Sequence, residues 1–438
     1  MYWIGHTTKY RAGSAKFARA AETLRADLAA RYPRARVVVE ALESKHDFVS
    51  GMRRLAEAGA RIDQLHFIGH SGMYGIMFGS TAWPEQLSPH EWRSVSIPFA
   101  TGASAYFHAC RTARWFAPFF ARTFQVRTFG NHGYTTVSSR PDRFTPEAFQ
   151  LGRGGPLYLV AVPGRKTHGW WGSARKYALR PPVEPMLAFE PTPAPDAGYD
   201  SVAELYDRAF SDIRVRHDEW RWLNQRLDRA FPRGSRAPRV LDLGCGNGAL
   251  LIALRDRIAS GVGVDVSPQM VERAERRARP YPRLSFSTIH GPELPYPDAS
   301  FDVVTSFLSF RYLDWDPVLR EVTRVLKPGG HLLIVDMVEQ KPGLREASLL
   351  VRSVVRHALS RIVDRRFARD LRTLVSQPAW AVMLAQNPIR ALHEYRWYLE
   401  SRFPGQKLVT LNASRHARLV AFDSGGLEPQ TLAPLSFP

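Results

Sequence analysis

The sequence contains few cysteines and no long hydrophobic run. Its 438 residues include two cysteines, Cys110 and Cys245, so a disulfide framework is excluded and a reducing compartment fits. No segment approaches the roughly 18 consecutive apolar residues that a membrane-spanning helix needs. The N-terminus, residues 1–6, lacks a charged segment followed by an apolar one, so no secretory signal is visible. These absences predict a cytoplasmic protein without a transmembrane segment.

Negative charge is also in short supply. The chain has 60 Lys and Arg against 41 Asp and Glu, a net charge of +19, and almost all of the positive charge is arginine. Such a balance favours nucleic acid, anionic lipid or acidic substrates as partners. However, the sequence shows no zinc-finger spacing, no clear helix-turn-helix and no aromatic ribonucleoprotein motif. Two interpretations of the charge therefore remain open: a generally arginine-rich proteome, and nucleic-acid binding.

A glycine-rich turn lies near the middle of the chain. Residues 240–250 form an apolar run that passes into Gly-Cys-Gly-Asn-Gly and opens a helix near Ala249. Gly244, Gly246 and Gly248 permit a sharp turn at a strand end and a close approach to a ligand, at which the helix points its free amides. The pattern predicts a nucleotide-like ligand, but a dehydrogenase uses a similar turn.

Three further segments follow this turn in order. Residues 261–267 form a short apolar strand that ends in Asp265, about 20 residues beyond the turn, as in a strand–helix–strand unit. Residues 293–304 include Leu-Pro-Tyr-Pro-Asp-Ala-Ser-Phe-Asp, and residues 319–336 include Leu-Lys-Pro-Gly-Gly before a buried strand. Together with Asp-x-Gly-Cys-Gly-x-Gly at 242–248, they resemble class I S-adenosylmethionine (SAM)-dependent methyltransferases, in particular the methyltransferase type 11 group.

The resemblance implies a fold, a cofactor and a set of binding residues. The fold is α/β and Rossmann-like, with a seven-stranded, mostly parallel sheet whose final strand is antiparallel, and the cofactor is SAM. The residues expected to line the methionine and ribose end of SAM are Asp242, Gly244, Gly246 and Gly248. Asp265 is expected to accept hydrogen bonds from the ribose hydroxyls. Cys245, inside the turn, is interpreted as a small packing residue.

The adenine contact departs from the family pattern. The loop before Leu294 usually offers an acidic residue to the adenine amino group, whereas this chain has His290, Gly291 and Glu293 there. A neutral His290 would accept that hydrogen bond; the alternative is a loop histidine that faces water. Candidates for a general base near the strand ends are His290, Tyr312 and Asp336.

A proline-dense segment predicts the domain boundary. Residues 180–198 contain repeated prolines and few periodic apolar positions, so we expect an extended linker there. Residues 199–207 resemble the helix that precedes the glycine turn in type 11 methyltransferases. The predicted organisation is therefore a domain at 1–179, a linker at 180–198, and a methyltransferase domain at 199–438.

The first domain has its own alternation of helices and strands. Residues 17–32, 47–60 and 114–123 predict helices, and residues 37–40 predict a strand. Residues 64–72 and 103–112 each predict a strand that runs into a polar segment, ending near His70 and Cys110. Parallel strands would bring both residues to the same carboxyl edge of a sheet, with about 4.8 Å between neighbouring strands. We therefore expect a histidine–cysteine dyad.

This pair resembles the caspase-like (clan CD) cysteine peptidases. The segment His-Ala-Cys-Arg-Thr at 108–112 is close to the family's Gln-Ala-Cys-Arg-Gly, and a histidine lies about 40 residues upstream. The resemblance implies an α/β sandwich in which His70 relays a proton, the Cys110 thiolate attacks a carbonyl, and the amides of Gly72 and Cys110 bind the oxyanion. The chain departs from the family in having His-Ser-Gly in place of His-Gly, and in His108 and Thr112.

Three alternatives to the dyad remain open from the sequence. Gly-His-Ser-Gly-Met at 69–73 nearly matches a nucleophile elbow, which would make Ser71 the nucleophile of an α/β-hydrolase, although a glycine-rich, strand-like segment follows where a helix belongs. His132 could replace His70 beside Cys110. Finally, the domain could be catalytically silent and bind a protein partner, with Cys110 as a buried thiol.

A helical insertion at about 340–402 is expected to shape the methyl-acceptor site. From Val351 to Leu374 apolar residues recur at helical spacing, with arginines over much of the remaining surface. Such a helix lies on a membrane surface, closes over an anionic substrate, or acts as a lid with a solvated arginine face. The aromatic residues expected either to line the acceptor pocket or to pack in the core are Trp380, Tyr395, Trp397 and Tyr398.

Two hypotheses cover the whole chain. In the first, it methylates a small or lipid-like molecule with SAM, and the caspase-like domain recognises a partner. In the second, the His70–Cys110 dyad is an active cysteine hydrolase that is regulated by, or coupled to, SAM binding. No motif for a metal site is present.

Overall fold

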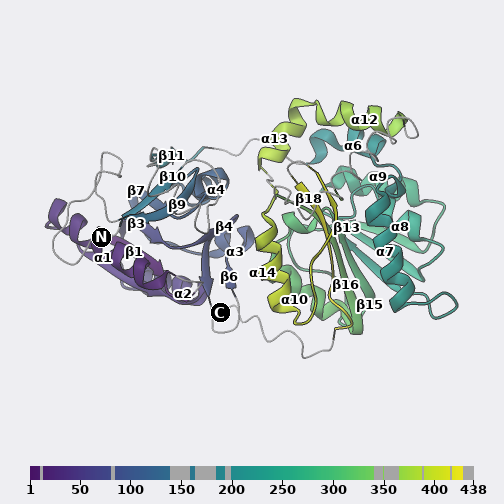
Figure 1. Cartoon of the computed structure of the whole chain (residues 1–438), viewed down its shortest axis with the longest axis horizontal. Coiled ribbons are helices and arrows are strands. Elements are labelled where there is room, and N and C mark those ends of the chain that lie inside the picture. Colours follow the sequence, from purple (N-terminus) through teal and green to yellow (C-terminus); the bar gives the residue numbers. More distant parts are fainter. Residues whose placement is uncertain are drawn as a thin grey trace. The chain divides into compact units, whose positions relative to one another are not determined.

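The structure is a computed structural model that describes residues 1–9, 13–79, 84–138, 158–162, 184–192, 199–339, 349, 365–386, 389–414 and 417–427. The chain divides into two compact units, one over Met1–Ala194 and the other over Pro195–Ser436. We call them the first and the second unit (Figure 1).

The first unit is built around a six-stranded sheet with the order β11-β8-β7-β3-β1-β2. Its strands are β1 Tyr2–Thr7, β2 Val37–Leu42, β3 Ile62–Ile68, β7 Phe99–His108, β8 Arg127–Gly130 and β11 Leu187–Phe189. All neighbours are parallel except the edge pair β8–β11. Parallel strands need crossover connections, which the helices supply. Two small sheets accompany it, made of β4 Ser71–Gly72, β5 Gly75–Gly79 and β6 Pro84–Gln86, and of β9 Tyr134–Ser138 and β10 Tyr158–Val162.

Helices cover both faces of this sheet, because successive strand residues point to opposite sides. The helices of the first unit are α1 Ser14–Arg31, α2 Lys45–Glu57, α3 Pro89–Ser94, the 3₁₀ turn η1 Thr112–Arg114 and α4 Phe116–Phe124. Ile4 faces α1 in one apolar cluster, whereas its neighbour Trp3 packs in a second cluster with α2, α3 and α4. Thus α1 lies on one face and the other helices on the opposite face.

The predicted linker differs from the observed boundary. Residues 184–192 are described, and within them Leu187–Phe189 forms β11, which pairs antiparallel with β8. The two units divide between Ala194 and Pro195, inside the predicted range of 180–198. Within the described residues 184–192, Leu187–Phe189 thus completes the first sheet, because an extended backbone satisfies its hydrogen bonds along an open edge.

The second unit contains a seven-stranded sheet with the order β14-β13-β12-β15-β16-β18-β17. Its strands are β12 Arg239–Leu243, β13 Ser260–Asp265, β14 Leu284–Thr288, β15 Phe301–Phe307, β16 Leu326–Glu339, β17 Val409–Ala413 and β18 Ala417–Asp423. β18 runs antiparallel to both of its neighbours, and the other pairs are parallel. The mostly parallel sheet that the methyltransferase resemblance implied is therefore present.

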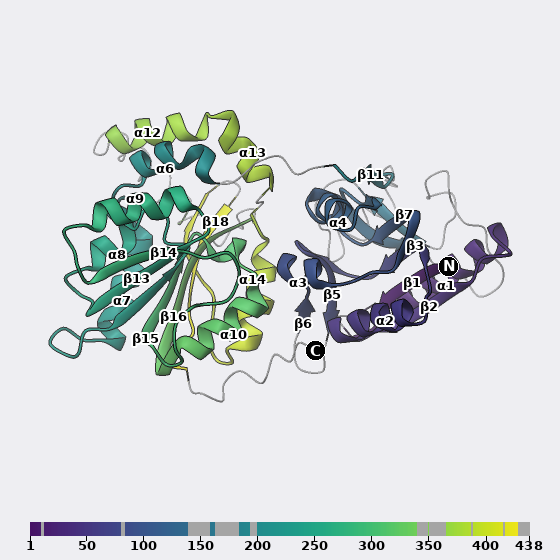
Figure 2. The same ribbon diagram turned by 180° about the vertical axis from the view of Figure 1, so that it is seen from behind.

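Helices flank this sheet on both faces (Figures 1 and 2). They are η3 Tyr199–Val202, α6 Ala203–Ala209, η4 Ile213–Val215, α7 His217–Ala230, α8 Ala249–Leu254, α9 Pro268–Ala278, η5 Phe310–Tyr312, α10 Trp315–Val325, α12 Arg365–Val375, α13 Pro378–Gln386 and α14 Leu392–Arg402. Val240 packs in one apolar cluster with α7, α8 and α9, and Leu241 packs in another with α10 and α14. The alternation along β12 thus assigns each helix group to one face.

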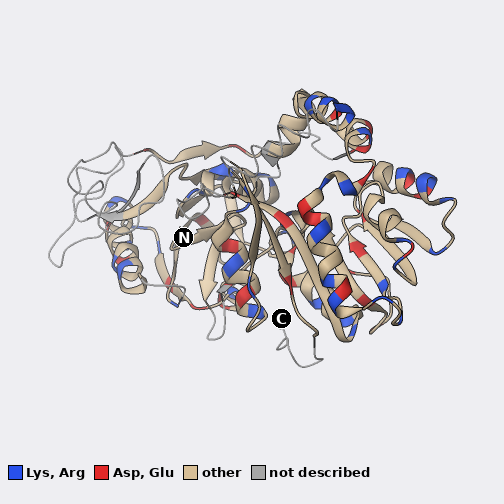
Figure 3. Ribbon diagram, turned by 45° about the vertical axis from the view of Figure 1, so that its right-hand side comes forward, with Lys and Arg blue, Asp and Glu red and all other residues tan. Residues whose placement is uncertain are grey.

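The predicted insertion is described in part. Residues 340–348, 350–364 and 387–388, which include most of the predicted arginine-rich stripe, lie outside the described residues. Its described helices α12 and α13 pack against α6 in a cluster that contains Leu374, Phe210 and Trp380. Figure 3 shows that Lys and Arg positions are frequent along α12. Among the described residues, no helix has the length and apolar character that crossing a membrane requires.

Candidate functional site

The glycine-rich turn joins β12 to α8 at the carboxyl edge of the second sheet. All three of its glycines have positive φ, at 72° for Gly244, 53° for Gly246 and 75° for Gly248. The amides of Gly244 and Cys245 donate to the Val264 carbonyl at 2.8 and 3.0 Å, which ties the turn to β13. Cys245 is buried in the adjoining apolar cluster, as its interpretation as a packing residue requires.

Gly246 and Gly248 differ in what surrounds them. A Cβ on Gly248 would lie 2.8 Å from Phe286 Cζ and 3.0 Å from Ala274 Cβ, so this glycine is required by internal packing. Among the described residues, the atom nearest to a Cβ on Gly246 would be Tyr206 Cε1, at 4.0 Å. These residues therefore leave space beside Gly246, where a ligand can approach the backbone without meeting a Cβ. The turn thus offers its open side at Gly246.

Asp265 ends β13 beside this open side. One of its carboxylate oxygens accepts from the Gly246 amide at 2.8 Å, and the other accepts from the Ser267 amide at 2.9 Å. Burial raises the pKa of this carboxyl, and the backbone hydrogen bonds oppose that rise. Each carboxylate oxygen has a second lone pair, so Asp265 retains acceptor capacity for two neighbouring hydroxyl groups of a ligand.

A second carboxyl group, Asp242, lies in β12 just before the turn. Its side chain is buried and accepts a hydrogen bond of 2.8 Å from the Thr305 hydroxyl of β15. Burial raises the pKa of Asp242 to about 7, and the negative charge of Asp265 adds to that rise. Two partly desolvated carboxyls at one strand edge favour a ligand that carries positive charge.

The predicted adenine contact is less well defined. His290 follows β14 at the same edge of the sheet and is exposed to solvent. In the loop after it, the Leu294 amide donates to the Glu321 carboxylate of α10 at 2.9 Å, so the Leu-Pro segment is held against α10. His290 is thus a solvent-facing residue at the edge of the sheet that carries the glycine turn.

The loop after β15 is a part of the site that sequence reasoning missed. Leu308 has a φ of 59°, a left-handed conformation that is costly for a residue with a Cβ. The next residue, Ser309, donates a hydrogen bond of 2.6 Å to the Leu243 carbonyl and lies against Gly244. Nothing in the sequence signals this contact, because Leu and Ser in that position fit an ordinary loop.

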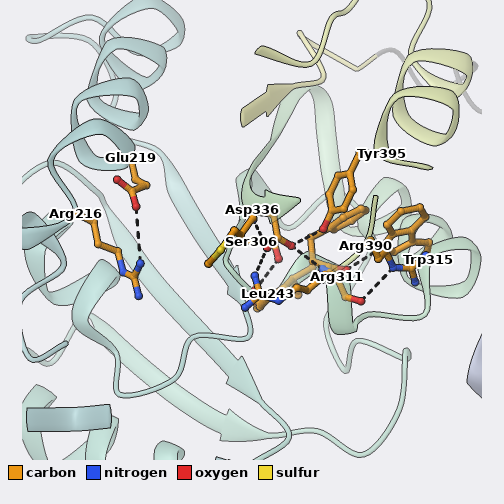
Figure 4. A network of polar contacts seen from close by, with 12 residues as sticks. Arg216, Glu219, Leu243, Ser306, Arg311, Trp315, Asp336, Arg390 and Tyr395 are labelled. Carbon is orange, nitrogen blue, oxygen red and sulfur yellow. Dashed lines mark hydrogen bonds and ion pairs between the residues drawn. The ribbon is translucent and has the colours of Figure 1, made fainter. Parts of the chain in front are cut away.

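Asp336 anchors this loop through a buried network (Figure 4). Asp336 is fully buried in β16 and accepts from the Arg311 amide at 2.7 Å and from the Tyr395 hydroxyl at 2.5 Å, and it forms an ion pair with the Arg311 guanidinium. Burial, followed by the charge of Asp336, raises the pKa of Tyr395. These contacts exclude Asp336 from direct reach of a substrate. Its expected role as a general base is therefore wrong for this structure.

The four aromatic residues expected either to line the acceptor pocket or to pack in the core fall into two groups. Tyr395 and Tyr398 are buried in the core on α14, where Tyr398 donates to Asp316 at 2.7 Å. Trp397 packs against the same core cluster. Trp380 of α13 is half-buried in the cluster with α6. Core packing is therefore the role of the α14 residues, and only Trp380 lies with the helices near the glycine turn.

In the first unit, the two residues of the expected dyad follow adjacent parallel strands. β3 and β7 pair in register up to Ile68 and His108, so His70 and Cys110 come directly after neighbouring strand ends. The Cys110 sulfur lies 3.3 Å from the Thr135 amide and 3.2 Å from the Thr135 hydroxyl. The His70 ring makes an edge contact with Phe17 of α1 at a centroid distance of 5.0 Å.

The surroundings of this pair decide between the alternatives. Ser71 begins β4, which turns back into β5, so a hairpin follows it and the nucleophile-elbow interpretation is wrong. The Ser71 hydroxyl donates to the Cys110 carbonyl. His132 is exposed, and its carbonyl accepts from Arg114 at 3.3 Å. Arg111, directly after Cys110, has a φ of 57°, a strained conformation of the kind that is frequent at functional sites.

No group of three or more His, Cys, Asp or Glu side chains suited to a metal ion occurs among the residues that the structure describes. Cys110 and Cys245 are both free thiols, in agreement with the expectation from the sequence.

Comparison with known proteins shows that the second unit is similar to methyltransferases. A family model described as a methyltransferase domain matches residues 241–334. The chain is 33% identical over 208 residues to the 27-O-demethylrifamycin SV methyltransferase of Amycolatopsis mediterranei, an alignment that covers 43% of this chain and 75% of that protein. It is 28% identical over 242 residues to the demethylmenaquinone methyltransferase of Lysinibacillus sphaericus, covering 53% and 87%. A solved SAM-dependent methyltransferase from Mesorhizobium loti shares 28% identity over 28% of this chain and 53% of that chain, with a TM-score of 0.25.

The similarity to the Amycolatopsis enzyme extends over three quarters of that protein, and the matched residues 241–334 include the glycine turn and Asp265. The chain therefore belongs to the class I SAM-dependent methyltransferases: it is an enzyme, and SAM is its cofactor.

Proposed function

We propose that the second unit binds SAM at the β12–α8 turn and transfers its methyl group to an apolar, ring-bearing small molecule. The observation that carries the proposal is the open side of Gly246 next to the Asp265 carboxylate. A ligand that reaches the backbone at Gly246 meets Asp265 within hydrogen-bonding range of its hydroxyls. In this proposal Asp265 accepts from the ribose, and Gly244, Gly246 and Gly248 form the turn around the methionine end.

The charges at this edge fit the cofactor. When bound, SAM supplies an electrophilic methyl group on a positively charged sulfonium. Asp242 and Asp265 are partly or fully buried carboxyls beside the turn, so their negative charge favours the cationic cofactor over the product, which loses that charge. The enzyme's remaining task is alignment of the acceptor with the methyl group, for which effective molarity provides much of the acceleration.

The acceptor class is supported by two observations. Two relatives are named as methyltransferases of demethylrifamycin and of demethylmenaquinone, which are small molecules. In this chain, half-buried aromatic residues of α6, α12 and α13 pack against one cluster, namely Tyr206, Phe367 and Trp380, and Tyr206 lies beside Gly246. Flat apolar rings of this kind pack against the faces of aromatic side chains. Tyr312 and His290 remain the candidates for a proton acceptor.

Calorimetric titration with SAM tests the cofactor site. We expect Asp265→Ala to weaken binding by at least tenfold, because a hydrogen bond to a charged group contributes about 1.5–3 kcal/mol. Asp256→Ala is a matched control, since the Asp256 side chain is 76% exposed and pairs only with its neighbour Arg255 in the contacts that the structure gives. If Asp265→Ala binds SAM as the wild type does, the proposed ribose contact is wrong.

The acceptor is tested by release of S-adenosylhomocysteine in the presence of a panel of demethylated hydroxyquinones and macrocyclic phenols. We expect turnover with at least one of these and none with aliphatic amines or amino acids of equal concentration. Trp380→Ala should raise the KM for the acceptor and leave the affinity for SAM unchanged. Turnover confined to small polar acceptors would contradict the proposed class.

A second candidate function belongs to the first unit. We propose that it has the caspase-like fold and that Cys110 and His70 act as a cysteine hydrolase in the cytoplasm, or that this domain binds a protein partner if the dyad is silent. The support is that His70 and Cys110 follow adjacent parallel strands, and that the backbone is strained at Arg111. The Cys110 thiolate would attack an amide carbonyl, and the proton taken by His70 would pass to the leaving amine.

Labelling with a thiol-directed peptide electrophile, followed by peptide mass spectrometry, tests this function. We expect Cys110 to react at least tenfold faster than free cysteine, and His70→Ala to remove that advantage. His132→Ala is the matched control, because His132 is an exposed histidine in the segment just before β9. A Cys110 that reacts no faster than a free thiol, with or without His70, would exclude the dyad.

A further inference from the structure

Helix α12 has one face that packs against the rest of the second unit and another that is exposed. On its inner side, Phe367 makes an edge contact with Phe210 at a centroid distance of 5.8 Å, and Leu374 is fully buried against α6. The outer side has a row of arginines, which we call the α12 arginine face, made of Arg365, Arg366, Arg369 and Arg372, all exposed. The apolar contacts that hold α12 in place thus come from its inner side and not from its arginines.

Within the part of the chain that the structure describes, one carboxylate pairs with this face. The side chains of Arg366 and Arg369 are 81% and 71% exposed, and both lie near the single acidic residue of the helix, Asp370. Asp370 itself is 3% exposed and also pairs with Arg208 of α6 at 3.5 Å. One buried carboxylate therefore serves several arginines, and the outer face keeps a net positive charge.

Apolar side chains adjoin the arginine face. Val375, the last residue of α12, is 48% exposed, and Val382 of α13 is 41% exposed. α13 has the sequence Pro-Ala-Trp-Ala-Val-Met-Leu-Ala-Gln, which contains no charged residue. A basic helix beside exposed aliphatic side chains is the combination that binds at the headgroup level of an anionic bilayer, where arginines meet phosphates and apolar groups enter the acyl boundary.

We propose that the α12 arginine face and the exposed valines of α12 and α13 form a docking surface for an anionic phospholipid membrane. Nucleic acid also attracts arginine, but it offers nothing for exposed aliphatic groups such as Val382, so the observations favour lipid. The surface lies close to the proposed catalytic machinery. α6 packs against α12 on one side, and its Tyr206 is the nearest residue to the open side of Gly246.

This position has a consequence for the acceptor. Docking through α12 and α13 brings the helices next to the SAM turn to the bilayer, where a lipid-soluble acceptor is concentrated. The docking surface is nevertheless independent of the proposed acceptor, because vesicle binding is measured without SAM and without any methyl transfer. Failure of one proposal is therefore distinguishable from failure of the other.

Sedimentation with lipid vesicles tests the surface. The full chain is mixed with vesicles of phosphatidylcholine that contain phosphatidylglycerol, and with vesicles of phosphatidylcholine alone. We expect binding to the anionic vesicles, with an affinity that falls steeply as salt rises, and at least tenfold weaker binding to the neutral ones. Because each arginine near an anionic surface contributes about fivefold in affinity, replacing all four by glutamine should weaken binding at least tenfold.

A matched variant controls for net charge. Its substitutions remove four exposed arginines of α7, of α9 and of the residue after α9, at Arg221→Gln, Arg229→Gln, Arg276→Gln and Arg279→Gln. We expect this control to bind anionic vesicles within about twofold of the wild type after correction for the lost long-range charge. Thermal melts establish that both variants are folded. Equal losses in the two variants would overturn the proposal, because binding would then follow total charge.

Two further measurements complete the test. Val375→Ser with Val382→Ser should weaken vesicle binding at least fivefold, since the variant loses the aliphatic surface that enters the acyl boundary. An RNA hairpin replaces the vesicles in the second measurement. If the wild type does not bind anionic vesicles, the membrane proposal is wrong. If the α12 arginines affect binding of the hairpin and not of the vesicles, the proposal is also wrong, and the surface is a nucleic-acid site.

Discussion

The buried carboxyl of Asp242 should make the stability of the second unit depend on pH. The substitution Asp242→Asn should remove that dependence. Asp242 is 2% exposed, and burial raises its pKa from 3.8 to about 7. A group whose pKa is higher in the folded state stabilises the fold at low pH. That stability is complete below the unfolded pKa and is lost as the pH rises through the folded value. Asparagine has nearly the same shape but does not titrate.

The magnitude follows from the size of the shift. One pKa unit corresponds to about 1.36 kcal/mol, so a rise of roughly three units makes the ionised form cost on the order of 4 kcal/mol at pH 8. Between pH 5 and 7, Asp242→Asn should therefore gain about 2–3 kcal/mol of unfolding free energy relative to the wild type. For a unit of this size, that gain is about 5–10 °C in melting temperature.

Scanning calorimetry at pH 5, 6, 7 and 8 measures this difference. The transition of the second unit is identified as the one that SAM raises, because a ligand stabilises the fold that binds it. Asp256→Asn is the control, since the Asp256 side chain is 76% exposed. A difference between Asp242→Asn and the wild type that is the same at every pH would refute the reasoning. In the wild type, affinity for the cationic cofactor should also rise through pH 7, and in the variant it should not.

Three more predictions follow from the same unit and its neighbour. Gly246→Ala should lower the unfolding free energy by about 1–2 kcal/mol through backbone strain, and it should weaken SAM binding at least tenfold. Gly248→Ala should lower the unfolding free energy by about 1–3 kcal/mol more, because its Cβ overpacks the core. Equal melting temperatures for the two variants would contradict this. Tyr395→Phe removes a hydrogen bond to the Asp336 carboxylate and should lower stability by about 1.5–3 kcal/mol in a melt, a loss that Asp336→Asn should not add to in full. Cys110→Ala should leave SAM affinity and methyl transfer within twofold of wild type, and a larger loss would mean that the two units are coupled.

Much of the second unit follows from its sequence because its strands are buried on both sides. Parallel strands covered by helices appear as continuous apolar runs, as in residues 261–264 and 332–335, and the glycine turn marks where β12 ends. These elements are specified by local pattern alone.

The first unit shows where local pattern fails. β1, Tyr2–Thr7, lies inside the sheet between β2 and β3, yet its sequence ends in His6 and Thr7, which weaken an apolar signal. β11 has the opposite problem, because its short segment lies among prolines that suggest a linker. Both strands are defined by pairing with residues far along the chain, which a single sequence does not reveal.

The network around Asp336 is a third case. Tyr395 was expected near the acceptor because it belongs to an aromatic group, and Asp336 because it follows a strand. Their mutual contact spans 59 positions of sequence, and it fills a buried site whose polar groups satisfy one another. A carboxylate and a phenol gain this role only when β16 and α14 are brought together, so no window of sequence contains the information.

The edge strand β11 also determines how the two units are to be separated. A fragment that ends near residue 180, where composition suggests a cut, lacks β11 and leaves the hydrogen-bonding groups of β8 exposed along the side of the sheet. Unprotected strand edges recruit strands from other molecules, so such a fragment should aggregate. A fragment that ends at Ala194 keeps the edge covered. The strand Leu187–Phe189 thus protects the β8 edge and belongs in any fragment of the first unit.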